Sequence, residues 1–278
     1  MRGLSCELVD RADCAGPAHD ERSRMSLRMV AFDLDDTLAP SKSPLPPLMD
    51  RRLCELLDHV EVCIISGGQM GQFKAQVLDN LHADSKELRR LHLMPTCGTR
   101  YYRHREGRWE EVYAHDLTPG ERSAAIDSLE RHARELGLWE ENPWGDIIED
   151  RGSQITYSAL GQEAPLEAKR AWDPTGEKKR ALRDAVAADL PDLEVRGGGS
   201  TSVDITRRGI DKAYGMAKLV EMTGVPAHDM LFIGDRLDPG GNDYPVKDAG
   251  YPTHAVSGWE DCADYIAELV ADLDRARA

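Results

Sequence analysis

The chain has 278 residues and a formal net charge of −15 at pH 7, with 41% hydrophobic and 31% charged residues. This length and composition are typical of a globular protein with one large or two modest domains, and they argue against a disordered chain. The acidic balance argues against a general nucleic-acid or membrane-surface binder, because such partners need basic surface, whereas a single pocket can still hold an anionic ligand.

The N-terminal segment and the cysteines indicate a cellular setting. Residues 1–24 are polar, broken by charge and without the apolar centre of a signal peptide, so we expect a disordered tail there. Apolar runs elsewhere have the length of strands, not of a membrane span. The six cysteines form no C-x-x-C pair, which favours reduced core thiols. We therefore expect a cytoplasmic protein without a membrane partner.

From residue 29 onward, short apolar runs alternate with amphipathic stretches. This pattern is typical of βα units around a parallel sheet. Two of the apolar runs end in an aspartate, which is unusual for a segment that reads as a buried strand. The predicted strands are 29–34, 61–66, 91–95 and 230–235, and the predicted helices are 47–60, 69–81 and 263–276.

The middle third of the chain has a different texture. Charged amphipathic helices and short alternating strands, separated by turn sequences, predict an antiparallel sheet with helices on one face. We expect this part, residues 103–208, to be a second domain inserted into a core made of 25–102 and 209–278. Its predicted helices are 121–137 and 177–190, and its predicted strands are 146–150, 154–160, 193–197 and 201–206.

Three carboxylates crowd the end of the first predicted strand within four positions, at Asp33, Asp35 and Asp36. Like charges crowded at the end of a buried strand cost folding free energy unless a cation or hydrogen-bond donors offset them. Strand ends of a parallel sheet share one crevice, so Asp33 is expected to meet Asp235, which ends another strand. The pattern indicates a functional site at this edge.

The residue types in that crevice suit metal-assisted phosphoryl transfer. Asp33, Asp235 and a backbone carbonyl near Asp35 offer hard oxygen ligands for Mg²⁺, and Asn242 and Asp243 are expected to bind or orient the metal. A carboxylate such as Asp33 can attack a phosphoryl group once a metal and a lysine screen the anions. Asp35, two residues on, is the candidate general acid and base.

Phosphate-binding donors are expected at two further strand and helix ends. Ser66 with the amides of Gly67 and Gly68 follows the second strand and can hydrogen-bond phosphate oxygens. Lys212, at a helix start, adds a fixed positive charge. Any one of these residues alone has an ordinary explanation, as a loop hydroxyl or a solvated lysine; their order along the chain carries the hypothesis.

These motifs give the chain a family resemblance. "DLDDT" at 33–37, then Ser66, Lys212 and "GDRLDPGGND" at 234–243 match, in order, the motifs of the haloacid dehalogenase superfamily, subclass IIB. The last motif and "STSVDITRRGIDK" at 200–212 are similar to those of eukaryotic-type phosphomannomutases and related sugar-phosphate phosphatases. The resemblance implies an α/β fold with a Rossmann-like parallel-sheet core and an inserted α/β cap, Mg²⁺ as cofactor, and an aspartyl phosphate on Asp33.

The resemblance also implies a sugar-phosphate site in the cap. Arg151, Ser202 and Asp204 match the family's cap arginine and its S-x-D pair, although each also has a plain surface reading. Elsewhere the chain departs from the family pattern. Gln162 replaces an arginine, Lys169 or Arg170 replaces another, Lys42 stands where the core has a further arginine, and Asp36 replaces a glycine.

These departures decide our expectation about the reaction. A mutase must hold a distal phosphate firmly, and bidentate arginine does so better than lysine or an uncharged glutamine. We therefore expect an enzyme that hydrolyses a hexose phosphate or similar sugar phosphate. The alternatives are a phosphomannomutase interconverting mannose 6-phosphate and mannose 1-phosphate, and a non-catalytic sugar-phosphate-binding module. Sucrose, trehalose and glucosylglycerate-like phosphates stay open as substrates, and so does the oligomeric state.

Overall fold

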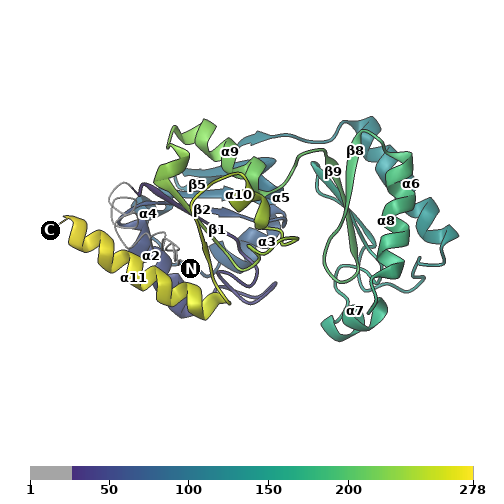
Figure 1. Cartoon of the computed structure of the whole chain (residues 1–278), viewed down its shortest axis with the longest axis horizontal. Coiled ribbons are helices and arrows are strands. Elements are labelled where there is room, and N and C mark those ends of the chain that lie inside the picture. The colour runs from purple at the N-terminus through teal and green to yellow at the C-terminus, as the bar shows by residue number, and fades with distance from the viewer. Residues whose placement is uncertain (1–26, 278) are drawn as a thin grey trace, which may run out of the picture.

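The computed structural model describes residues 27–277, so the expected tail at 1–24 lies outside the described part. Figure 1 shows two α/β units joined by two connections. The long C-terminal helix lies on the unit that also contains the start of the described chain. The chain leaves the first unit after residue 114 and returns to it between residues 207 and 212. We call these units the core and the cap.

A seven-stranded sheet forms the centre of the core, in the order β11-β10-β1-β2-β3-β4-β5. The five strands from β11 to β3 pair in parallel, and β4 and β5 continue the sheet as an antiparallel hairpin. The strands are β1 (Met29–Phe32), β2 (Glu61–Ile65), β3 (Leu91–Met94), β4 (Arg100–Arg105), β5 (Arg108–Ala114), β10 (Met230–Gly234) and β11 (Thr253–Ala255).

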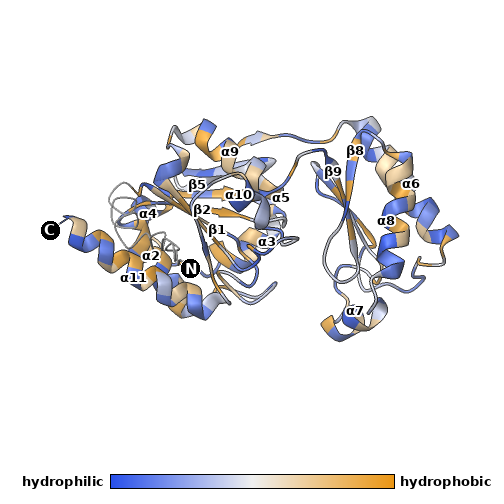
Figure 2. Cartoon of the chain, in the orientation of Figure 1, coloured by the Kyte–Doolittle hydropathy of each residue, from blue (hydrophilic) through white to orange (hydrophobic). Residues whose placement is uncertain are grey.

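Helices cover both faces of this sheet. The side chains of β1 alternate, so that Val30 and Phe32 pack under α2 and α11, whereas Met29 and Ala31 pack towards α9 and α10. Both faces are apolar, as expected for parallel strands buried on both sides, and Figure 2 shows the hydrophobic strands in the middle of the core. The core helices are α2 (Pro47–Leu57), α3 (Met70–Phe73), the π-helical η1 (Lys74–Leu78), α4 (Ser85–Leu88), α5 (Pro95–Gly98), α9 (Lys212–Thr223), the 3₁₀ turn η2 (Ala227–Asp229), α10 (Tyr244–Asp248) and α11 (Trp259–Arg277).

The cap is a four-stranded antiparallel sheet in the order β6-β7-β9-β8, with two long helices on one face. Ile155 and Tyr157 of β7 point into the apolar layer under those helices, together with Val203 and Ile205 of β9. The alternate positions of both strands therefore point to the other face. The cap elements are α6 (Pro119–Glu135), β6 (Ile148–Asp150), β7 (Gln154–Ser158), α7 (Leu166–Trp172), α8 (Glu177–Asp189), β8 (Leu193–Gly197) and β9 (Ser202–Arg207).

The predicted α/β architecture, a parallel-rich core sheet with a separate antiparallel cap sheet, is confirmed. One boundary differs from expectation: residue 103, expected to begin the inserted domain, lies within β4, and both β4 and β5 belong to the core sheet. Among the described cysteines, Cys54, Cys63, Cys97 and Cys262 are free thiols. Of the helices that the structure describes, none combines the length and apolarity needed to cross a membrane.

Candidate active site

Neighbouring strands bring three carboxylates together at one edge of the core sheet. Asp33 follows β1 and Asp235 follows β10, and these strands pair in parallel with Phe32 opposite Ile233. Asp243 joins them from the loop after β10. Carboxylate oxygens of Asp33, Asp235 and Asp243 lie within 4.8 Å of one another. The predicted meeting of Asp33 and Asp235 at one strand edge is therefore present in the structure.

Lys212, the first residue of α9, lies between two of these carboxylates. Its Nζ is 2.7 Å from Asp33 Oδ1 and 2.5 Å from Asp243 Oδ1, and all three side chains are buried. Burial by itself lowers the pKa of Lys212, but the charges of Asp33 and Asp243 outweigh this and raise it above its ordinary range. Lys212 is consequently a permanent cation at the centre of the cluster.

Asp33 is in the most strongly perturbed environment of the cluster. Burial above all, and the Asp243 carboxylate after it, raise the pKa of Asp33 to about 7 against the opposing effect of the Lys212 charge. Its Oδ1 also accepts a hydrogen bond of 2.6 Å from the backbone amide of Leu34. Since one ammonium faces two buried carboxylates, the cluster has an excess of negative charge that a cation would neutralise.

The donor set of the cluster fits Mg²⁺. The three ligand groups offer only carboxylate oxygens, which this hard cation prefers. Two ligands are themselves held in place: Thr37 Oγ1 donates to Asp235 Oδ1 at 3.2 Å, and the Arg236 amide donates to Asp243 Oδ2 at 3.0 Å. Of the other predicted metal residues, Asn242 is exposed beside Asp243, and Asp35 turns its carboxylate to different partners.

Asp35 is held by donors that the sequence reading did not identify. Its Oδ1 accepts from the Lys42 backbone amide at 2.7 Å and from Gln76 Nε2 at 3.3 Å. Its Oδ2 accepts from Gln72 Nε2 at 2.9 Å. The signal available in the sequence was the four-residue spacing of the two glutamines on a predicted helix, which places them on one side.

The predicted phosphate loop follows β2, the strand next to β1. Ser66 is buried, and its Oγ accepts from the Gly68 amide at 3.2 Å. Backbone bonds from Cys97 N to Ser66 O and from Thr96 N to Gly68 O, both 2.9 Å, fix the loop against α5. Ser66 and Gly67 therefore lie at the same edge of the sheet as Asp33.

Cap residues contact this edge of the core directly. Arg151 Nη1 donates to the Gly67 carbonyl at 3.2 Å, while the rest of its guanidinium pairs with Glu149. Gln69, at the start of α3, hydrogen-bonds to Glu149. Ser153 Oγ accepts from Thr99 Oγ1 at 2.6 Å in the core. Arg151 thus forms the ion pair with Glu149 that the sequence left open, and it also contacts the core; its sugar-phosphate role stays a prediction.

The polar face of the cap sheet carries the predicted S-x-D pair. Asp204 Oδ1 accepts from Thr156 Oγ1 at 2.7 Å and from Gln154 Nε2 at 3.0 Å, and burial raises the pKa of Asp204. Ser202 lies one pleat along β9, with its Oγ 3.4 Å from Ser158 Oγ. Gln154 and Thr156 were not identified from the sequence, although their alternation along β7 places them beside Asp204.

Three of the residues that depart from the family pattern lie near one another at the junction of core and cap: Lys42, Gln162 and Lys169. Lys169 Nζ donates to the Gln162 carbonyl at 2.8 Å. Burial lowers the pKa of Lys169, and the positive charge of Lys42, across from it in the core, lowers it further. Among the described residues, the buried Gln162 Nε2 has no hydrogen-bond partner. The two like charges of Lys42 and Lys169 at the junction of core and cap favour an anion there.

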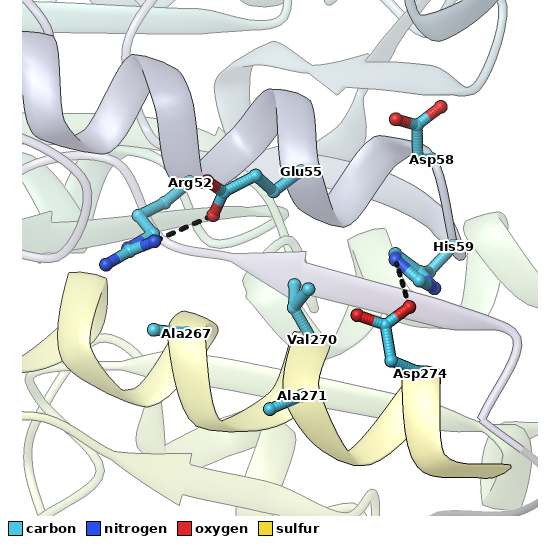
Figure 3. Close-up of a pocket in the computed structure, with 8 residues that line it drawn as sticks. All are labelled: Arg52, Glu55, Asp58, His59, Ala267, Val270, Ala271 and Asp274. Atoms are coloured by element: carbon cyan, nitrogen blue, oxygen red, sulfur yellow. Dashed lines mark hydrogen bonds and ion pairs between the residues drawn. The ribbon is translucent and has the colours of Figure 1, made fainter. Parts of the chain in front are cut away.

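A separate hollow of about 400 Å³ lies between α2 and α11 and contains none of the predicted site residues. Both helices reach it at the ends nearer the amino edge of the sheet, away from Asp33. Figure 3 shows its two ion pairs: Arg52 pairs with Glu55 along α2, and His59, just after α2, pairs with Asp274 of α11. We assign it no role in the chemistry.

Comparison with known proteins places the chain in a family. A family model described as eukaryotic phosphomannomutase matches residues 107–272, more than half of the chain. The chain belongs to the eukaryotic phosphomannomutase family. The matched segment contains the cap sheet, Lys212 and the loop with Asp235 and Asp243, whereas Asp33, Asp35 and Ser66 precede it. The suspected membership of the haloacid dehalogenase superfamily is thereby confirmed.

Individual relatives agree with the family assignment, and a solved structure shares the fold. A probable phosphomannomutase of Caenorhabditis elegans is 24% identical over 90% of this chain and 98% of that protein. A phosphomannomutase of Saccharomyces cerevisiae is 25% identical over 87% of this chain and 93% of that protein. A haloacid dehalogenase-like hydrolase from Bacteroides thetaiotaomicron has the same fold, with a TM-score of 0.62 at 15% identity, covering 87% of this chain and 99% of that chain.

Proposed function

We propose that this protein is a Mg²⁺-dependent phosphomutase of hexose phosphates that works through an aspartyl phosphate on Asp33. The observation that carries the proposal is the family match over residues 107–272, together with relatives named phosphomannomutase along most of the chain. This support favours the mutase over the hydrolysis that the sequence reading preferred. A cytoplasmic location stays an expectation.

The first half-reaction begins with a dianionic phosphate ester at the Asp33 edge. Asp33 attacks phosphorus, the bond from phosphorus to the sugar oxygen breaks, and the proton of Asp35 passes to that oxygen. The products are the acyl phosphate, the free hydroxyl and the Asp35 carboxylate. Lys212 stabilises the anionic oxygens throughout, and Ser66 and the Gly67 amide bind the phosphoryl group.

A metal held by Asp33, Asp235 and Asp243 would supply a positive charge that draws phosphate and nucleophile together. In the second half-reaction the Asp35 carboxylate takes the proton of an incoming hydroxyl, which attacks the acyl phosphate and regenerates Asp33. In a mutase this hydroxyl belongs to the sugar, and in a phosphatase it belongs to water. The cap residues Asp204 and Ser202 are suited to holding sugar hydroxyls, and Lys42 and Lys169 to holding the distal phosphate.

Hydrolysis is the second candidate, and the observation that favours it is the uncharged Gln162 at the junction of Lys42 and Lys169. If the distal phosphate is held more weakly, the bisphosphate intermediate leaves the site sooner. The phosphoenzyme is then open to attack by water. A Gln162→Arg variant separates the two cases: if retention limits the mutase, this variant transfers more phosphoryl groups per phosphate released than the parent protein.

The deciding experiment follows mannose 6-phosphate by ³¹P NMR with Mg²⁺ and a hexose 1,6-bisphosphate. The mutase predicts mannose 1-phosphate without inorganic phosphate, and the hydrolase predicts inorganic phosphate. In either case Asp33→Asn is expected to lower turnover by at least about 10⁴-fold, because the covalent route is removed. If the parent protein turned over no sugar phosphate, with or without the bisphosphate, both candidates would be wrong.

A further inference from the structure

The carboxylate of Asp35 is fixed on both oxygens by uncharged donors. Oδ1 accepts two hydrogen bonds, from the Lys42 amide at 2.7 Å and from Gln76 Nε2 at 3.3 Å, whereas Oδ2 accepts one, from Gln72 Nε2 at 2.9 Å. An arginine or lysine in these places would form a charged pair with the carboxylate. Amide donors instead set its orientation without adding a charge beside it.

A change of helix type places the two glutamines. Met70–Phe73 is α-helical and Lys74–Leu78 is π-helical, so the helix widens between Gln72 and Gln76. Residues four apart stay on the same side in both geometries, and π-helical turns are frequent at functional sites. The Gln76 carbonyl accepts from the Leu45 amide at 2.7 Å, which ties this turn to the segment that follows Asp35.

The orientation of the Gln76 amide is determined by its surroundings. Its side chain is buried, and Nε2 donates both to Asp35 and to the Ser43 carbonyl, the latter at 2.9 Å. A reversed amide would present its oxygen to two acceptors. In the orientation observed, Oε1 has no partner among the described residues, an unfavourable arrangement that is retained for the sake of the two donated bonds.

Gln72 links the phosphate loop to Asp35. A Cβ atom at Gly68 would lie 2.1 Å from Gln72 Oε1, so the amide lies directly over this glycine and any larger residue would displace it. Gly68 follows Ser66 and Gly67 in the loop expected to bind phosphate. The absence of a side chain at Gly68 therefore leaves the space that the Gln72 side chain occupies when it contacts Asp35.

We propose that Gln72 and Gln76 are positioning residues for Asp35, and that they leave Oδ2 as the oxygen that exchanges a proton with the sugar oxygen. Oδ1 already accepts two donors, whereas Oδ2 accepts one and has a lone pair to spare. This inference rests on the proposed function, because it concerns the proton that Asp35 gives to the leaving sugar oxygen as the phosphorus–oxygen bond breaks.

The test compares two leaving groups in rapid-mixing experiments with Mg²⁺. A sugar alkoxide needs the proton of Asp35 to leave, whereas p-nitrophenolate leaves without one. For Gln72→Met and Gln76→Met, which keep side-chain length but remove the donor, we expect phosphoenzyme formation from a hexose phosphate or 1,6-bisphosphate to slow by about 10–100-fold. The p-nitrophenolate burst from p-nitrophenyl phosphate is expected to change less than about threefold, as in Asp35→Asn.

Controls separate the possible outcomes. Lys74→Met, on the same helix but exposed and paired with Asp79, is expected to leave both rates unchanged. Equal slowing with both leaving groups would mean a merely structural role, and no slowing with either would mean no role; each overturns the proposal. Gln72 is only half-buried, so its variant tests the idea even if Gln76→Met unfolds. A parent protein that forms no phosphoenzyme from any of these donors would overturn the proposed function itself.

Discussion

Lys212 Nζ lies 2.7 Å from Asp33 Oδ1, and both side chains are buried at the edge where β1 ends. The same ammonium contacts Asp243, so it balances one of two buried carboxylates and leaves the other to a metal or a proton. An arrangement of this kind costs folding free energy in the absence of its ligand, which is typical of a site kept for chemistry and not for stability.

Removing the ammonium should destabilise the fold. In Lys212→Met, Asp33 and Asp243 lose their buried partner, and we expect the free energy of unfolding to fall by about 3–5 kcal/mol, measured by urea denaturation without divalent metal. Lys218→Met, one turn and a half further along α9, breaks only the exposed pair with Glu221 and is expected to change little. Equal effects of the two variants would contradict the central role of Lys212.

Mg²⁺ should stabilise the folded protein, because it offsets the repulsion among Asp33, Asp235 and Asp243. A ligand that binds only the folded state adds about 2.7 kcal/mol at a hundred times its dissociation constant, so the melting temperature is expected to rise with Mg²⁺ concentration. Sodium chloride at equal ionic strength is the control for screening. The shift should vanish in Asp235→Asn and persist in Asp238→Asn, whose exposed side chain pairs with Arg236. A shift retained in Asp235→Asn would exclude this site.

A buried histidine in the core sheet should make stability depend on pH. His92 Nε2 is 2.6 Å from Glu61 Oε2 and its Nδ1 is 2.7 Å from the Tyr101 hydroxyl. Burial, with the nearby Arg103 charge, lowers the pKa of His92 below its ordinary value of 6.5, against the opposing effect of Glu61. The unfolded chain therefore takes up the His92 proton first as pH falls, and the contribution of His92 to the free energy of unfolding should decrease below about pH 6.5.

The measurement compares urea unfolding at pH 7.5 and 5.5, a window that stays above the titration of Glu61, whose pKa lies below 4.5. The free energy of unfolding should change less favourably on acidification in the parent protein than in His92→Gln, because only the parent loses the His92 contribution. His228→Gln is the matched control, because His228 is exposed in the turn before β10 and should leave the decrease unchanged. An identical pH dependence in parent and His92→Gln would show that His92 does not carry it.

Lys169 and Arg170 offer a matched pair for the distal phosphate. Lys169 is half-buried and close to the Lys42 charge, whereas its neighbour Arg170 is exposed. Loss of one charged contact costs about 1.5–3 kcal/mol, so Lys169→Met should raise KM for a hexose phosphate by about tenfold or more. Turnover of p-nitrophenyl phosphate, which has no distal phosphate, should not change. The reverse ranking, with Arg170→Met the more damaging, would assign the contact to the arginine.

Local patterns were sufficient for much of this molecule. Apolar runs predicted β1, β2, β3 and β10, because a strand buried on both faces has a continuous apolar signature. The rule that parallel strand ends share an edge then predicts that Asp33 and Asp235 lie together. The sequence pattern did not predict the hairpin β4–β5 as part of the core sheet, because its half-exposed, charged strands resemble the surface segments of the cap.

By itself the sequence determined the layered α/β architecture and the candidate nucleophile, because both follow from periodicity and from the order of short motifs along the chain. Only the tertiary structure decided that Gln72 holds Asp35, that Asp243 shares Lys212 with Asp33, and that Arg151 reaches the Gly67 carbonyl. These contacts join residues about 30 to more than 80 positions apart. Side-chain hydrogen bonds over such separations depend on how the elements pack, which no local pattern encodes.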